Sequence, residues 1–188
     1  MTKRRNEKGK AAHKRAAFPF SNRVRPVTGD SRSGPSHCNK DRFEAARQRG
    51  NSMPAANLLD QAIDAYVKGF ETDWRDPYPG VNAVTLMEIK EPPDPRREKL
   101  LPVVRYAVER RIAAGKPDYW DFATRLELAV LAEEQPDAQS SLEAARLAAR
   151  SPWETETTAR NLRLINEVRG KRGAIPSWMQ SIPESLML

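Results

Sequence analysis

Residues 73–86, D-W-R-D-P-Y-P-G-V-N-A-V-T-L, contain a turn that leads into a short apolar helix. Two prolines and a glycine interrupt the chain, and an apolar run follows them. Pro79 suits the first turn of a helix, because the N–H that proline lacks would have no partner there. We therefore expect a helix that begins near Pro79. The residues that we assign to the turn are Trp74, Arg75, Asp76, Tyr78, Pro79 and Gly80.

Six segments between residues 54 and 172 carry helical patterns, and none of them alternates with the period of a strand. In the first segment Leu59, Ile63, Tyr66 and Phe70 recur at three- and four-residue steps, which places them on one helix face. Proline and glycine signals separate the segments. The sequence therefore predicts an all-α fold. The expected helices cover residues 55–72, 79–90, 96–114, 118–134, 137–150 and 154–169.

The spacing of large and small residues is similar to that of a tetratricopeptide repeat, a unit of two helices over about 34 residues. Ala62 and Tyr66 have the interval of a second repeat helix. Tyr119, Phe122 and Ala123 have the intervals of a first helix. These matches predict a tetratricopeptide-like, right-handed α-solenoid of about six helices, because small residues at such positions let neighbouring helices approach closely.

In this register the first helix is the second half of a pair whose first half is missing. The complete pairs are 79–90 with 96–114 and 118–134 with 137–150, and the sixth helix caps the array with a polar face that includes Arg169. The apolar face of the first helix would then lose burial worth about 1.5–3 kcal/mol for each large side chain. We expect that residues 41–53 or another chain cover this face, or that the chain is a truncated repeat protein.

Residues 1–50 carry most of the positive charge, with fourteen Lys and Arg residues and four acidic residues. They lack apolar periodicity, and Gly, Pro and Ser interrupt them, so we expect a disordered basic tail. Residues 54–172 form the predicted helical domain, and residues 173–188 an irregular C-terminal tail. The tail leaves open an alternative function in nucleic-acid binding, through phosphate contacts. The residues that would make these contacts are Lys3, Arg4, Arg5, Lys8 and Lys10.

The sequence lacks several residue types that enzymes use for catalysis, since residues 41–188 contain neither His nor Cys. This absence excludes Ser/His/Asp and Cys/His nucleophilic schemes there, together with metals held by His or Cys. Asp118 and Asp121 lie at the start of a predicted helix, where acidic residues commonly act as caps. Capping explains the presence of these two carboxylates more simply than acid/base catalysis does. We expect no enzyme activity, no cofactor and no metal. The chain contains no apolar run long enough for a membrane span, and we expect a cytoplasmic protein.

Candidate partner-binding residues lie on the first helices of the repeats. Trp120, Thr124 and Glu127 follow one another at helical spacing, on the face opposite the predicted packing residues. A tryptophan there could anchor a protein partner or pack into the core. Asn82 interrupts an apolar helix, where its amide could contact a bound peptide or satisfy a neighbouring turn.

Two stretches, Y-V-K-G-F-E-T-D-W-R-D-P-Y-P-G-V-N-A-V-T-L-M at 66–87 and D-Y-W-D-F-A-T-R-L-E-L-A-V-L-A at 118–132, resemble the TRAFs-binding domain. This family occurs in the regulatory region of apoptosis-signal-regulating kinases and in bacterial tetratricopeptide-repeat proteins. The resemblance covers about residues 65–172 and implies an all-α regulatory or scaffolding domain without catalysis. The Ala-rich composition, with more Arg than Lys, is more typical of bacteria, so the animal TRAF partner is not carried over.

These observations predict a protein–protein interaction or scaffolding domain of a regulatory or signalling assembly. The repeat spacing and the missing catalytic residue types carry this prediction. The sequence does not identify the protein partner or the oligomeric state.

Overall fold

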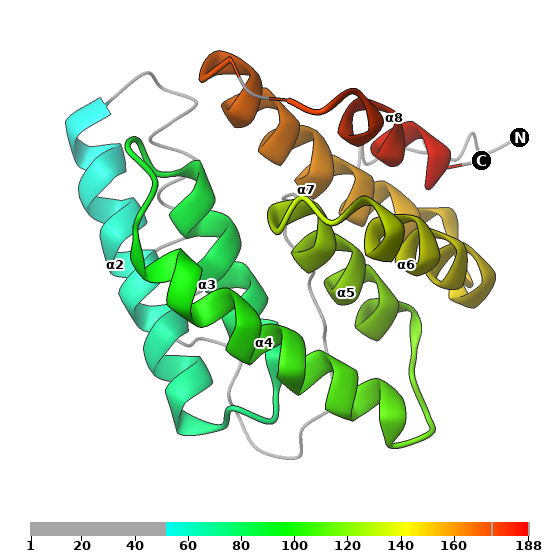
Figure 1. The fold of residues 1–188 in the computed structure, drawn as a ribbon. Helices are drawn as coiled ribbons and strands as arrows, with labels where there is room; N and C mark the ends of the chain where they lie inside the picture. Colours follow the sequence, from blue (N-terminus) through cyan, green and yellow to red (C-terminus); the bar gives the residue numbers. More distant parts are fainter. Residues whose placement is uncertain (1–51, 174, 188) are drawn as a thin grey trace, which may run out of the picture.

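The computed structural model describes residues 52–173 and 175–187, and within these ranges all regular secondary structure is helical (Figure 1). The prediction of an all-α fold is confirmed. No helix in the described ranges is long and apolar enough to cross a membrane. The helices are α2 (Ser52–Thr72), α3 (Pro77–Ile89), α4 (Arg96–Ala113), α5 (Tyr119–Leu131), α6 (Gln135–Ala148), α7 (Pro152–Lys171) and α8 (Ser177–Ser185).

Helix α3 begins at Pro77, two residues before the predicted start. Asp76 Oδ1 accepts a hydrogen bond from the Tyr78 backbone N–H at 3.2 Å and so caps the helix. Tyr78, Pro79 and Gly80 therefore lie in the first turns of α3. For Pro79 and Gly80 this agrees with the predicted helix 79–90, whereas Tyr78 belongs to the helix and not to the turn before it. The cap explains why the helix begins two residues earlier than predicted. An aspartate at the N-cap followed by a proline is itself a signal for a helix start, and Asp76 and Pro77 provide it.

Helix α3 is the most deeply buried element, with every residue from Gly80 to Ile89 inside the core. It packs against α2, α4, α5 and α7, so neighbours surround it on nearly all sides (Figure 1). A helix in that position has to be apolar on nearly every face. The three residues of this segment that carry polar side chains, Asn82, Thr85 and Glu88, are therefore the most informative ones in it.

The apolar face of α2 is fully covered, against the expectation that it would lose burial. Leu59, Ile63, Tyr66 and Phe70 are each 6 % exposed or less. The first three share one apolar cluster with residues of α3 and with Leu164 of α7. Helix α3 packs extensively on this face. Residues 41–51 lie outside the described residues, so cover by that segment, cover by another chain and truncation of the protein stay predictions.

Helix α7 contacts both α3 and α5, and α3 and α5 also contact each other. In an open solenoid each repeat touches only its neighbours in sequence. Here α7 also contacts α3, so these contacts are not limited to helices adjacent in sequence. The solenoid geometry stays a prediction, while the contact between α3 and α7 determines where the site described below can lie.

Residues 177–185 form helix α8, so the prediction of an irregular C-terminal tail over 173–188 was wrong. Met179, Ile182 and Leu186 are buried at 4 % exposure or less, and α8 packs on α7 and α6. The segment was misjudged because it is short and contains Pro183 inside the helix, which is a helix-breaking signal. Packing of its apolar face outweighs that local preference.

Candidate partner-binding site

The four residues proposed for partner binding, Asn82, Trp120, Thr124 and Glu127, line the same small cavity. The cavity has a volume of about 20 Å³. Helices α3, α5 and α7 enclose it. Its other lining residues are Tyr78, Val81, Ala123, Thr158 and Asn161.

Helical spacing on all three helices explains why these residues meet. Tyr78 and Asn82 are one turn apart on α3, Trp120 and Thr124 are one turn apart on α5, and Thr158 precedes Asn161 by three residues on α7. Residues three or four apart share one face of a helix. Each helix therefore turns one partly polar face toward the other two. The four candidate residues were chosen from α3 and α5 alone, and α7 completes the enclosure.

Glu127 lies at the buried end of the cavity and is 6 % exposed. The Thr85 hydroxyl of α3 donates a hydrogen bond to its Oε1 atom. The Asn161 Nδ2 amide of α7 donates to its Oε2 atom at 3.3 Å. The carboxylate thus joins the three helices, and a buried carboxylate needs such donors because its desolvation is costly.

Asn161 has a side-chain oxygen, Oδ1, that is buried without a hydrogen-bond partner among the described residues. The residue itself is 5 % exposed. The amide cannot improve its position by rotating end for end, because its oxygen would then face the Glu127 carboxylate, which only accepts when ionised. Asn161 is one of the residues that line the cavity, and a buried amide oxygen without a donor among the described residues is an acceptor that a polar group from outside the chain could satisfy.

Asn82 is buried, and its Nδ2 amide donates to the Tyr78 carbonyl oxygen at 2.8 Å. This bond lies within α3, four residues back along the same helix, so the two alternatives for Asn82, contact with a bound peptide or with a neighbouring turn, both stay predictions. The amide still lines the cavity, so the local bond and a role at the site are compatible.

An aromatic group lies on the solvent side of the site. Trp120 is half-buried and makes edge-to-face contacts with Tyr119 at 5.1 Å and with Trp153 at 5.4 Å between ring centroids. Trp153 of α7 remains 43 % exposed. Trp120 therefore packs on Tyr119, and its pair with Trp153 reaches the surface, while anchoring of a protein partner stays a prediction.

The Tyr119 hydroxyl connects α5 to the start of α7 through hydrogen bonds. Its hydroxyl oxygen lies 2.8 Å from Thr158 Oγ1 and 3.0 Å from the Glu154 carbonyl oxygen. Burial raises the pKa of this hydroxyl, so it stays protonated as a donor across the physiological range. The predicted start of one helix is also confirmed by geometry, because Asp118 and Asp121 form a reciprocal capping box at α5.

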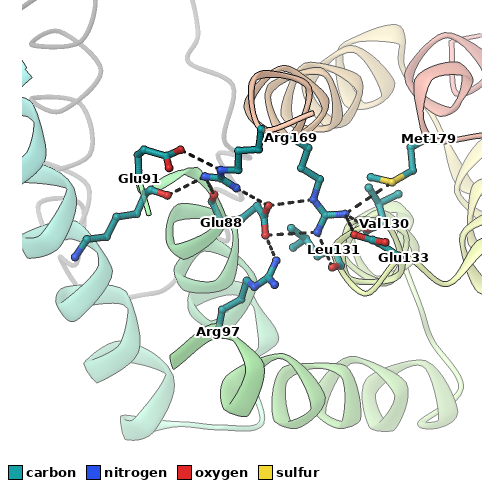
Figure 2. A network of polar contacts seen from close by, with 10 residues as sticks. Glu88, Glu91, Arg97, Val130, Leu131, Glu133, Arg169 and Met179 are labelled. Carbon is teal, nitrogen blue, oxygen red and sulfur yellow. Dashed lines mark hydrogen bonds and ion pairs between the residues drawn. The ribbon is translucent and has the colours of Figure 1, made fainter. Parts of the chain in front are cut away.

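A second polar cluster surrounds Glu88 at the end of α3 (Figure 2). Glu88 is 2 % exposed and forms ion pairs with Arg97 of α4, Arg169 of α7 and Arg172 just beyond α7. The distances are 3.0 Å from Arg169 Nε and 3.0 Å from Arg172 Nη1 to Glu88 Oε1. Three helices are held together by this one carboxylate.

The remaining donors of Arg169 are also used. Its Nη2 atom donates to the Leu131 carbonyl oxygen at 2.8 Å, and its Nη1 atom lies 3.0 Å from Glu133 Oε1, as Figure 2 shows. Burial lowers the pKa of this guanidinium, while the Glu133 carboxylate acts in the opposite direction. Because the arginines and glutamates of the cluster satisfy one another, we assign it a structural role in holding α7 against α3. Arg169 had been expected on an exposed polar face, and its 5 % exposure corrects that expectation.

Sequence reasoning missed Thr85, Trp153 and Asn161. A signal existed for Thr85, which follows Asn82 by three residues in an otherwise apolar helix. Asn161 and Trp153 could not be assigned, because nothing in the local pattern shows that α7 packs against α5, where their partners Glu127 and Trp120 lie.

The remaining predicted residues lie elsewhere. Trp74 is 54 % exposed, and Arg75 pairs with Asp73 at 2.8 Å within the turn before α3. The nucleic-acid candidates Lys3, Arg4, Arg5, Lys8 and Lys10 lie outside the described residues. The structure therefore leaves the nucleic-acid alternative untested.

A larger surface hollow of about 710 Å³ lies between α6, the connection to α7 and the end of α8. Arg146, Leu147 and Met187 are among its lining residues, and Leu147 is 89 % exposed. None of the predicted binding residues contributes to it.

Comparison with known protein families gives a match over nearly the whole sequence. The family described as the MAP3K TRAFs-binding domain matches residues 2–183, a wider range than the residues 65–172 that carried the resemblance. Comparison with curated proteins and comparison with solved structures each found no match. With almost the whole sequence matched, the chain belongs to the MAP3K TRAFs-binding domain family.

Proposed function

We propose that this chain is a non-enzymatic interaction domain that scaffolds a regulatory or signalling assembly, in a bacterial cytoplasm. The family description names binding of TRAF proteins, which supports a protein as the partner. We further propose that the partner contacts the face that α3, α5 and α7 form around Trp120. We call this surface the inner face, defined by Tyr78, Trp120, Thr124 and Trp153.

The observation that carries this proposal is the pair formed by Trp120 and Trp153. A half-buried tryptophan in edge-to-face contact with an exposed one presents a rigid apolar surface. Tryptophan is enriched among residues that dominate binding energy, since it buries much area at little cost in side-chain entropy. The polar groups of the adjacent cavity would supply the specificity.

The test is quantitative co-purification followed by affinity measurement with the purified partner. The full chain and its Trp120→Ala and Trp153→Ala variants serve as baits, and circular dichroism confirms that each variant keeps its helices. We expect each tryptophan variant to weaken the affinity by about 30-fold or more, the loss of about 2 kcal/mol that defines a binding hot spot.

Leu147→Ala is the matched control, because Leu147 is a large apolar residue that is 89 % exposed and lies outside the inner face. It should change the affinity by less than about threefold, as surface residues away from an interface do. A partner whose affinity falls with Leu147→Ala and not with either tryptophan variant would refute the inner face as the binding surface.

The alternative function, nucleic-acid binding by residues 1–50, is supported by their charge alone. A salt titration of DNA and RNA binding with the full chain, and with a variant in which Lys3, Arg4 and Arg5 become alanine, distinguishes it from partner binding. Steep salt dependence that these substitutions reduce would favour the alternative.

A further inference from the structure

We propose that the cavity beside Glu127 receives the ammonium group of a lysine side chain from the protein partner. This inference rests on the proposed function and specifies the chemistry that the partner presents to the inner face. Its evidence is the size of the cavity, the acceptors at its buried end and the aromatic side chains on its solvent side.

The size of the cavity selects a compact group. A volume of about 20 Å³ accommodates a single water-sized group. The ammonium of lysine is a compact point charge of that size on a flexible stem, whereas the guanidinium of arginine is a larger planar fork. The cavity is therefore too small for arginine and for whole apolar side chains.

The acceptors at the buried end match the donors of an ammonium group. Asn161 Oδ1 is buried and has no hydrogen-bond donor among the described residues. Glu127 lies next to it, joined by the bond from Asn161 Nδ2. An ammonium has three donors and no acceptor, so it satisfies the amide oxygen and adds a charge-assisted bond to the carboxylate. A neutral hydroxyl could also donate to the amide oxygen. Because it carries no positive charge, it would interact with the Glu127 carboxylate more weakly than an ammonium would.

The aromatic side chains favour a cation with an apolar stem. Tyr78 and Trp120 line the cavity and are only partly buried, whereas Glu127 and Asn161 are buried, so the rings lie on the side toward solvent. A lysine that enters from solvent would lay its methylene stem along these rings. Its charged head would gain further from the negative faces of the rings.

The test is an NMR titration of the full chain with N-acetyl-lysine methylamide. The neutral norleucine analogue has the same stem without the ammonium, and the arginine analogue has a larger cation. We expect saturable shifts of the Trp120 indole N–H and of the Asn161 side-chain amide with the lysine analogue. The arginine analogue should bind about tenfold more weakly or not at all, and the norleucine analogue should cause no saturable shift.

Glu127→Gln removes the charge and keeps an oxygen that accepts from Thr85, so it should weaken binding of the lysine analogue by about tenfold or more. Glu143→Gln, an exposed position of α6, is the control and should leave binding unchanged. Should Glu127→Gln disturb the fold, Trp120→Leu tests the aromatic contribution at a partly exposed position. It should also weaken binding.

Absence of saturable shifts at the cavity with the lysine analogue would overturn the inference, because the site would then hold only water. Equal binding of the lysine and norleucine analogues would overturn it as well. Neither result would contradict the proposed function, provided that Trp120→Ala and Trp153→Ala still abolish partner binding. Conversely, lysine binding at the cavity without any effect of the tryptophan variants on the partner would refute the proposed function and leave a lysine site.

Discussion

Arg169 Nε lies 3.0 Å from Glu88 Oε1 and forms an ion pair between α7 and α3, across 81 residues of sequence. Both side chains are almost fully buried, at 5 % and 2 % exposure. The pair joins α3 to α7, two of the three helices that enclose the cavity at the inner face. The stability of the site therefore depends on a pair of charges that do not line it.

Replacing Glu88 should be among the most destabilising single changes in the chain. Glu88→Ala leaves Arg169 buried without its main counter-charge, and breaking a buried pair in this way costs about 3–5 kcal/mol. Urea unfolding followed by circular dichroism measures the change in free energy of unfolding. Glu91→Ala is the matched control: Glu91 pairs with Arg172 from a side chain that is 72 % exposed, so its loss should cost less than about 1 kcal/mol. Equal losses for the two variants would contradict a structural role for the buried pair.

The sequence was sufficient to predict the helices and part of the site, because both depend on local spacing. The three- and four-residue steps located every helix from α2 to α7, and Asp118 with Asp121 marked the start of α5 correctly. Asn82 and Glu127, chosen from two separate helices, line the same cavity. Their convergence follows from the contact between α3 and α5.

What could not be predicted depends on contacts between distant segments. Arg169 reads as one more charged residue in a helix rich in Arg and Glu, and only the approach of α3 makes it a buried residue. Asn161 was missed for the same reason. Helix α8 was missed because Pro183 argues against a helix locally, while the burial of Met179 and Ile182 stabilises it through tertiary packing.

Gly80 should resist substitution because α3 packs closely on its neighbours there. A Cβ atom at this position would lie 2.5 Å from Val104 Cγ2 and 3.0 Å from Phe70 Cδ2. Gly80→Ala should therefore cost about 1–3 kcal/mol through overpacking, although alanine is intrinsically the better helix former. Thermal or urea unfolding checks this.

Gly69→Ala provides the control, because Gly69 also lies inside a helix and a Cβ there would only touch Pro79 Cβ at 3.4 Å. This variant should be neutral or stabilised by up to about 1 kcal/mol. If both glycine variants were stabilised alike, the close packing of α3 against Val104 would be refuted.

Asp94 should make the connection between α3 and α4 sensitive to acid. The Arg96 guanidinium and backbone N–H bond to this carboxyl and hold its pKa below the ordinary value of 3.8. A depressed folded-state pKa stabilises the protein above the unfolded pKa, and this contribution disappears as the pH falls through the folded pKa. Asp94→Asn should therefore cost about 1 kcal/mol at pH 6 and much less at about pH 2, as urea unfolding at the two pH values would show. A cost that did not shrink in acid would contradict the pairing with Arg96.

Met179 should contribute to the core through α8, which the sequence alone did not reveal. Its side chain is fully buried, and its backbone carbonyl oxygen accepts from Asn166 Nδ2 of α7 at 2.9 Å. Met179→Ala should cost about 2–5 kcal/mol, the usual cost of truncating a buried methionine. Met187→Ala is the matched control, since Met187 is 48 % exposed and follows the same helix. It should cost less than about 0.5 kcal/mol. If the two methionine variants unfolded at the same urea concentration, α8 would not be packed on α7 in solution, and residues 177–185 would belong to an irregular tail after all.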